Sequence, residues 1–179
     1  PETSDIAPAV ESHKDNPEIK KSPFTAIQRI VAQKMAENWK RPHIHDDVEI
    51  DVIKIWREYK DKKEEFERAF GTKLTLTHYF AYAAVKTLMR EEFWKFRSAV
   101  EENPPTYVVK DFVNLSFAVD IPAIIDGLPH RELLAPVVKD AQLKSFTGLA
   151  LAITQLAESA RTKKLKPDDV KNGTITVTN

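Results

Sequence analysis

Four side chains of types that bind metal ions occupy every second position near the start of the chain: His43, His45, Asp47 and Glu49. The alternation of polar and apolar residues around them predicts a half-buried strand over residues 43–52. Side chains two apart on a strand point to the same side, so these could together bind zinc or iron. The alternative is a polar strand face that lines solvent or a channel. The absence of cysteine, which leaves no thiolate to complete a site, favours that alternative.

The other reactive side chains form no recognisable catalytic pattern. Ser116 lies in NLSFAVD, a stretch typical of a strand, and the G-x-S-x-G turn that exposes a nucleophilic serine is absent. His78, within LTHYF, is expected at a helix N-terminus or in a packing position, and His130 is expected in a solvated loop. Neighbouring carboxylates such as Asp168 and Asp169 are typical of a solvated surface. The residues by themselves single out no catalytic set.

Composition and charge exclude several classes of function. The 27 basic and 27 acidic residues cancel, so the chain lacks the basic excess of a protein that binds nucleic acid through phosphates. Its four glycines lie far apart, which excludes the glycine-rich loops of Walker-type and Rossmann-type nucleotide sites. The longest apolar run, residues 79–85, is too short to cross a membrane, and no signal-peptide pattern is present. These features predict a soluble, intracellular protein.

Helices with one apolar face are predicted from the spacing of hydrophobic residues. They cover residues 25–40, 52–70, 77–91 and a segment that begins at Ser145. Gly71 is a typical C-terminal stop for the second helix. The third is apolar nearly all round, as expected of a helix buried in the core.

Strands alternate with these helices in no regular order. They are predicted over residues 106–110, 113–121, 133–138 and 173–179, with a loop at 121–131. Because the chain lacks a regular βαβ rhythm, we expect an α/β (α+β) fold in which helices pack on a mixed sheet.

The start of the chain differs in composition from the rest. Residues 1–22 are rich in proline and charge and contain no aromatic residue, so they cannot bury enough apolar surface to offset the entropy lost on ordering. We expect a flexible interdomain linker over residues 1–22 and a folded domain over residues 23–179.

Five blocks occur in a characteristic order along the chain. They are SPFTAIQRIVAQKMAENWKRPHIHDDVEIDV, GTKLTLTHYFAYAAVKTL, FRSAV, VVKDFVNLSFAVDIP and LLAPVVKDAQLKSFTGLALAITQLAESARTKKLKPDDVKNGTITVTN. Together they resemble the catalytic domain of the dihydrolipoamide acyltransferases, the acyltransferase component of 2-oxo acid dehydrogenase complexes. The resemblance covers residues 22–179.

This resemblance implies a chloramphenicol-acetyltransferase-like fold and a homotrimer with active sites at subunit interfaces. It implies transfer of an acetyl, succinyl or branched-chain acyl group between a dihydrolipoyl group and coenzyme A, both of them substrates, with no metal. The implied partners are the lipoyl domain and the dehydrogenase (decarboxylase) and lipoamide dehydrogenase subunits, with no nucleic acid and no membrane. The implied location is the cytoplasm or, in a eukaryote, the mitochondrial matrix.

Acyl transfer of this kind needs a base for the thiol and a hydrogen-bond donor for the tetrahedral oxyanion. In the family the donor is a Ser or Thr hydroxyl in a strand that aligns with residues 176–179, so the resemblance implies Thr178 as the oxyanion donor. The family's base is the histidine of His-x-x-x-Asp-Gly, which this sequence lacks. His43 has an Asp four residues on, but Val48 follows it. We therefore expect the N-terminal two-thirds of the domain, inactive by itself.

Two further interpretations are consistent with the sequence. One is a non-catalytic acyltransferase-like scaffold or oligomerisation module, and the other is a metal-binding domain that uses His43 and His45. The segment AIIDGLPHRELLAPV is longer than the family's connection at this point. Such an extension either alters the substrate channel or lengthens a surface loop.

Overall fold

A computed structural model describes residues 23–24, 26–40, 44–125 and 128–178 of the chain. The described residues fall into two compact units that divide between Asp47 and Val48. The linker predicted over residues 1–22 lies outside the described residues, as does His43. Within the described part, no helix is long and apolar enough to cross a membrane.

The first unit contains helix α1 (Ala26–Asn38), which lies within the predicted helix. Its apolar side chains are largely exposed, with 58% of Met35 and 78% of the following Trp39 accessible. Residues 44–50 form no strand, so the strand predicted over 43–52 is wrong for its described part. Alternation alone does not make a strand, because the backbone needs a hydrogen-bonded neighbour, and the pairs of described strands do not include this segment.

The second unit contains three helices close to the predicted positions: α2 (Ile53–Phe70), α3 (Leu76–Leu88) and α4 (Phe146–Arg161). Helix α2 ends because Gly71 adopts a left-handed φ of 66°, which lets its amide donate to the Glu67 carbonyl over 2.9 Å. Helix α4 begins at Ser145, whose Oγ accepts a hydrogen bond of 3.1 Å from the Gly148 amide. Standard caps therefore explain where both helices stop or start.

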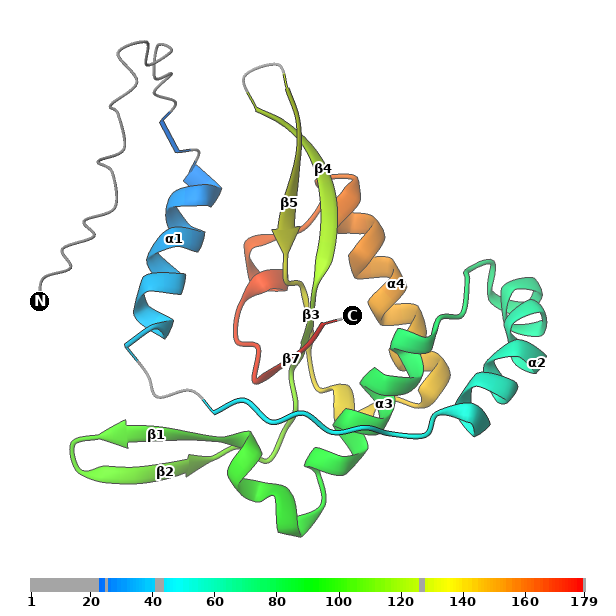
Figure 1. Cartoon of the computed structure of the whole chain (residues 1–179), viewed down its shortest axis with the longest axis horizontal. Coiled ribbons are helices and arrows are strands. Elements are labelled where there is room, and N and C mark those ends of the chain that lie inside the picture. The colour runs from blue at the N-terminus through cyan, green and yellow to red at the C-terminus, as the bar shows by residue number, and fades with distance from the viewer. Residues whose placement is uncertain (1–22, 25, 41–43, 126–127, 179) are drawn as a thin grey trace, which may run out of the picture. The chain divides into compact units, whose positions relative to one another are not determined.

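The described strands form three small sheets (Figure 1). Strands β1 (Ser98–Glu102) and β2 (Pro105–Val109) pair antiparallel, as do β4 (Val119–Ile125) and β5 (Leu128–Leu134). The third sheet has the order β6-β3-β7, from β3 (Leu115–Phe117), β6 (Val137–Val138) and β7 (Ile175–Val177). Strand β3 is antiparallel to β6 and parallel to β7. Short 3-10 helices cover Glu91–Arg97, Ala141–Leu143 and Pro167–Val170.

Three predictions are wrong in this region. The strand expected over residues 133–138 is divided between the end of β5 and β6, because residues 135–136 form no strand. The single strand expected over residues 113–121 is divided at Ala118, where the chain leaves β6 and β7 and begins to pair with β5. The loop expected over residues 121–131 is mostly the β4–β5 hairpin, which continues from β3 in Figure 1. Pro122 and Pro129 suggested a loop, yet both fit here because each strand of a two-stranded sheet has a free edge.

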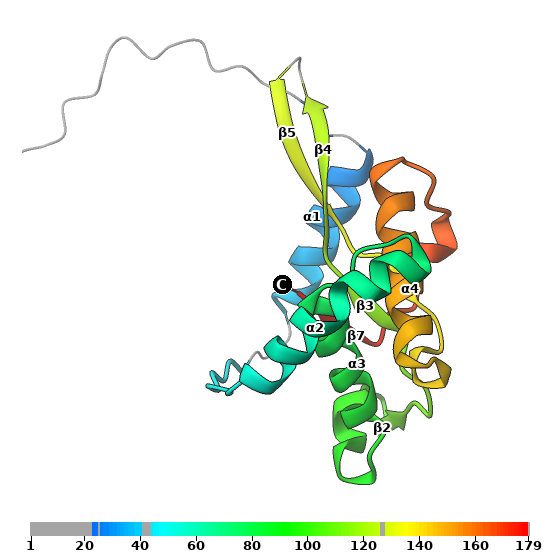
Figure 2. The ribbon, with the colours of Figure 1, turned by 90° about the vertical axis from the view of Figure 1, so that its right-hand side faces the viewer.

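The main core lies between helices α3 and α4 and the strands that run beside them (Figure 2). Val85 of α3, Leu115 of β3 and Leu149 of α4 are completely buried in it. The apolar nature of α3 agrees with this central place, because several of its faces meet other elements. The predicted mixed α/β class is confirmed, and the core includes Leu115 and Phe117 of β3, the central strand of its sheet.

Candidate active site at the end of β7

Thr178 is the first residue after strand β7, and its position follows from the pairing of β7 with β3. The two strands are parallel, with Ser116 opposite Thr176 and Phe117 opposite Val177. The ladder extends one step further, since the Ala118 amide donates to the Val177 carbonyl over 3.3 Å. The chain is therefore held in register up to the residue that precedes Thr178.

The side chains of β7 alternate between core and solvent. Ile175 and Val177 pack against the main core, whereas Thr176 is exposed. Thr178 is exposed as well, so its hydroxyl is accessible to a molecule that approaches the end of the strand. The exposed Thr178 therefore directly follows a strand whose backbone is hydrogen-bonded to the centre of the sheet.

Ser116 lies on the neighbouring strand but cannot play the same part. Only 6% of the residue is exposed, and its Oγ donates to the Ala135 carbonyl over 3.2 Å. Gly173 approaches it closely from the chain before β7, because a Cβ at Gly173 would lie 3.3 Å from the Ser116 Cβ. The Ser116 side chain is therefore buried next to Gly173, and its hydroxyl is used in a hydrogen bond within the fold.

His78 occupies the first turn of α3, as expected from the sequence. Its Nδ1 accepts a hydrogen bond of 3.2 Å from the Thr75 amide, so the proton of the neutral ring is on Nε2. Only 4% of the residue is exposed, and burial lowers the pKa of His78 below its ordinary value. The ring is consequently neutral near pH 7 and stabilises the start of the helix.

The proposed metal ligands are not brought together in the described structure. His45, Asp47 and Glu49 lie on the irregular segment before α2 and are exposed, while His43 lies outside the described residues. Across residues 23–24, 26–40, 44–125 and 128–178, no three His, Asp or Glu side chains form a group that could hold a metal ion. His130 belongs to β5, a strand that the sequence prediction treated as a loop.

A cavity of about 580 Å³ reaches the same end of β3. It is lined by the loop between α2 and α3, by residues 117–119 and by α4, with His78, Lys73 and Arg161 among its polar groups. Its volume is in the range of small-molecule sites. Because Ala118 both lines this cavity and binds the Val177 carbonyl, the cavity adjoins the strand end that leads to Thr178.

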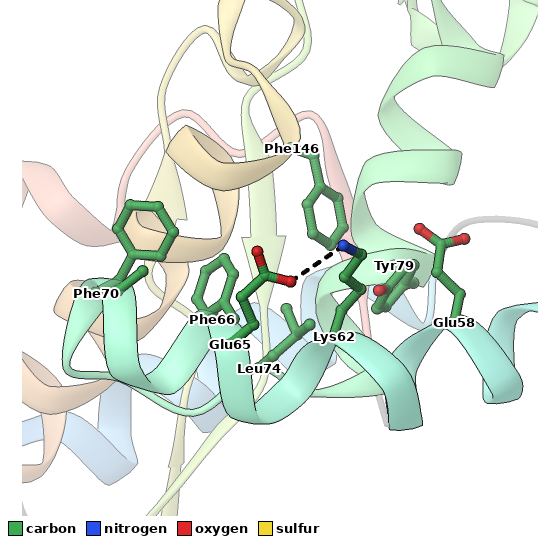
Figure 3. A pocket seen from close by; sticks show the side chains of 9 residues that line it. Glu58, Lys62, Glu65, Phe66, Phe70, Leu74, Tyr79 and Phe146 are labelled. Carbon is green, nitrogen blue, oxygen red and sulfur yellow. Dashed lines mark hydrogen bonds and ion pairs between the residues drawn. The ribbon is translucent and has the colours of Figure 1, made fainter.

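A second hollow of about 350 Å³ lies between α2 and the starts of α3 and α4 (Figure 3). Phe66, Tyr79 and Phe146 supply its apolar lining, and Lys62 pairs with Glu65 at 3.1 Å on its α2 side. Burial, reinforced by the charge of Glu58, raises the pKa of Tyr79. None of its lining residues comes from β3 or β7, so this hollow is separate from the Thr178 site.

The sequence prediction missed Asn114, a buried polar residue immediately before β3. Only 7% of it is exposed, and its side chain bonds to the chain on both sides of the sheet's central strand, at Asp140 and Asn172. The available signal was an amide side chain between two apolar residues, Val113 and Leu115, in a stretch otherwise typical of the core. A buried polar residue needs hydrogen-bond partners, which periodicity does not reveal.

The family model for the 2-oxoacid dehydrogenases acyltransferase (catalytic domain) matches residues 16–179. The relatives include the dihydrolipoyllysine-residue acetyltransferase components of pyruvate dehydrogenase complex from two bacteria. That of Corynebacterium glutamicum is 33% identical over 156 residues, covering 87% of this chain and 21% of the relative. That of Staphylococcus aureus is 32% identical over 179 residues, covering 99% of this chain and 39% of the relative. The chain thus spans well under half the length of these relatives.

Solved structures give the same result. The dihydrolipoamide acetyltransferase of Azotobacter vinelandii, studied for the catalytic roles of a serine, a histidine and an asparagine, matches with a TM-score of 0.79 and 28% identity, over 97% of this chain and 67% of that one. A probable dihydrolipoamide acetyltransferase of Listeria monocytogenes matches with a TM-score of 0.77 and 29% identity, over 89% of this chain and 64% of that one. These likenesses confirm the predicted chloramphenicol-acetyltransferase-like fold.

Proposed function

Because this chain belongs to the family of 2-oxoacid dehydrogenase acyltransferase catalytic domains, we propose that its protein transfers an acyl group between a dihydrolipoyl thiol and coenzyme A. The attacking sulfur, after losing its proton to a base, forms a bond to the thioester carbonyl carbon. The resulting tetrahedral intermediate carries a negative charge on oxygen. The bond to the other sulfur then breaks, and that sulfur takes up the proton. Coenzyme A and the lipoyl group are the substrates, and no step requires a metal.

The hydroxyl of Thr178 is the donor that meets the oxyanion. The observation that carries this proposal is an exposed hydroxyl directly after a strand whose backbone is hydrogen-bonded to the centre of the sheet. A donor fixed before the reaction stabilises the developing charge without a cost of reorganisation. The cavity beside Phe117 and Ala118 supports the same location, because a thioester must be shielded from water during transfer.

The general base is a histidine that this chain does not contain. Of its five histidines, none is followed four residues later by the Asp-Gly pair of the family's His-x-x-x-Asp-Gly segment. We expect the base to come from a histidine segment outside residues 1–179. The 179 residues would then supply the oxyanion donor and part of the substrate channel. By themselves they would not catalyse acyl transfer.

A homotrimer is the expected assembly. Exposed apolar side chains on and after α1 support it, because Met35, Trp39 and Ile44 are 58%, 78% and 96% exposed in the single chain. Large apolar surfaces of this kind are typical of contacts with another chain. We further expect association with the lipoyl domain and with the dehydrogenase and lipoamide dehydrogenase subunits, in the cytoplasm or the mitochondrial matrix. The pyruvate dehydrogenase relatives favour acetyl as the acyl group.

The test is an acyl-transfer assay with acyl-coenzyme A and dihydrolipoamide on the protein extended to include its histidine segment. Replacing Thr178 by alanine should lower kcat by about 10²–10³-fold, the usual effect of removing one oxyanion donor. Thr178→Ser, which keeps the hydroxyl, should retain most of the activity, and Thr176→Ala, two residues earlier, is the matched control. The rate of acyl transfer by the 179-residue chain should not exceed that of the uncatalysed reaction. Turnover by that chain, or an unchanged kcat in Thr178→Ala, would contradict the proposal.

A second candidate is a non-catalytic scaffold or oligomerisation module. The same exposed apolar residues on α1 favour it, since they would serve assembly whether or not chemistry follows. Sedimentation of the extended protein together with the assay separates the two functions. A trimer without turnover would support the scaffold, and a trimer with turnover sensitive to Thr178 would exclude it.

A further inference from the structure

Two separate turns meet at Asn114, the residue before β3, which is hydrogen-bonded to the start of the strand that leads to Thr178. The Asn114 Nδ2 donates to the carbonyl of Asn172, in the turn before β7, over 2.9 Å. The Asn114 Oδ1 accepts from the amide of Asp140, in the turn after β6, over 2.9 Å. The donor and the acceptor of one buried amide therefore connect two turns, one next to β7 and one next to β6, to the residue that precedes the central strand β3.

The backbone of Asn114 adds bonds to the residue just before β7. The Asn114 amide donates to the Thr174 Oγ1 over 3.0 Å, and the Thr174 amide donates to the Asn114 carbonyl over 2.9 Å. The Thr174 hydroxyl in turn donates a hydrogen bond of 3.2 Å to the Asn114 carbonyl. Every polar group of Asn114 is thus used within this junction of residues 113–114, 140–142 and 172–174.

Both side-chain partners of Asn114 have unusual backbones. Asp140 has a φ of 48° and Asn172 a φ of 61°, in the left-handed region that residues with a side chain rarely adopt. Conformations of this kind persist only where the surrounding structure holds them. The two bonds from Asn114 supply such a constraint, since each ends on the backbone of one left-handed residue.

Strand β7 depends on this junction because it is short. It has three paired residues, its partner lies about sixty positions earlier in the chain, and it is at the edge of its sheet. A slip of one residue would move Thr178 by about 3.3 Å and turn its side chain to the opposite face. The junction sets the register at the start of the strand, four residues before Thr178, where Gly173 passes close to Ser116 and Val137.

We propose that Asn114 is a positioning residue for acyl transfer: by holding the start of β7 it places the Thr178 hydroxyl where the oxyanion forms. This inference rests on the proposed function, since it requires Thr178 to be the donor. In this role Asn114 does not contact the substrate, and it affects the reaction only through the position of strand β7.

A double-mutant cycle on the extended protein tests the inference, with Asn114→Asp, Thr178→Ala and the combined variant. Aspartate keeps the size of the side chain and the acceptor for Asp140, but it sets a carboxylate oxygen against the Asn172 carbonyl. We expect Asn114→Asp to lower kcat at least tenfold with the KM for coenzyme A within twofold, because the loss is confined to the transition state. In the Thr178→Ala background the same change should lower kcat no further.

The outcomes distinguish the two proposals. Effects that multiply in the combined variant, or an unchanged kcat in Asn114→Asp alone, would overturn the positioning role while leaving Thr178 as the donor. An unchanged kcat in Thr178→Ala would overturn the donor role itself, and the positioning role with it.

Two controls separate positioning from a general loss of stability. Ser145→Ala removes one side-chain bond of similar length, 3.1 Å to the Gly148 amide, at the start of α4. It should lower the unfolding midpoint and leave kcat unchanged. Should Asn114→Asp fail to fold, the pair Thr174→Val and Thr174→Ser replaces it: the valine should reduce kcat as Asn114→Asp would, and the serine should restore it. Equal kcat in these two variants would contradict the inference.

Discussion

Helices α1 and α4 each have an apolar face, and the two faces differ in how far they are buried. In α4, Leu149 and Ile153 are 0% and 5% exposed, because the helix packs on α3 and the strands of its own unit. In α1, Ile30 and Met35 are 61% and 58% exposed. The pattern predicts which face of a helix is apolar, whereas the fold decides whether that face meets the same chain or another one. Both helices have an apolar face, and that of α4 is covered within its own unit, whereas that of α1 is exposed.

The largest expected effect is the loss of stability when α4 is truncated in the core. Leu149→Ala should lower the free energy of unfolding of the chain by about 2–5 kcal/mol, since it removes a fully buried side chain and leaves a cavity. The matched change Met35→Ala in α1 should lower it by less than about 0.5 kcal/mol, as expected for an exposed site. Urea unfolding followed by circular dichroism measures both. Equal losses would show that α1 is also part of the core of the isolated chain.

A smaller effect is expected on assembly when charge is introduced on the apolar face of α1. Ile30→Asp should weaken the trimer of the extended protein at least tenfold, equivalent to about 1.4 kcal/mol, because a carboxylate would have to lose its water in the contact. Analytical ultracentrifugation measures the dissociation. Ala36→Asp introduces the same charge at an exposed position that faces away from Ile30 around the helix, and it should leave the trimer intact. A trimer that tolerates Ile30→Asp would assign the apolar face of α1 to some other partner.

The smallest expected effect concerns His78 within the second unit. Burial lowers the pKa of His78 in the folded chain, so below about pH 6.5 the unfolded chain binds more protons than the folded one. The free energy of unfolding should therefore fall as the pH is lowered through this range and level off below the folded pKa. Urea midpoints at pH 7.5 and 5.5 measure the change. His78→Gln, which retains an acceptor at the helix start, should reduce this dependence, and an unaltered pH profile would contradict the assignment.

Local features allowed most helices to be predicted. The serine cap and apolar spacing of α4, and the glycine that ends α2, act within a few residues of each other and can be read directly. The division between β3 and β4 at Ala118 could not be predicted, because the apolar alternation continues through it from Val113 to Ile121. The break arises from a change of pairing partner, which is a property of distant strands. The same reason explains the hairpin found where a loop was expected.

The candidate site also combines features that the sequence indicated with features that depend on distant parts of the chain. Resemblance to the family singled out Thr178, and no local rule distinguishes it from the other threonines of the closing segment. Its accessibility and its attachment to the sheet follow from the parallel pairing with β3. Asn114 was missed because its partners, Asp140 and Asn172, lie 26 and 58 positions away along the chain.

The sequence by itself therefore determined the class of fold, the ends of helices α2 and α4, and the membership of a family, and it supplied Thr178 as a proposed oxyanion donor. These properties depend on residues a few positions apart or on blocks that can be compared directly. Only the tertiary structure decided that residues 44–50 form no strand, that β3 ends at Phe117, and that the buried amide of Asn114 bonds to the turn before β7. Each of these depends on which distant backbone supplies a hydrogen-bond partner, and that choice is made by packing of the whole domain.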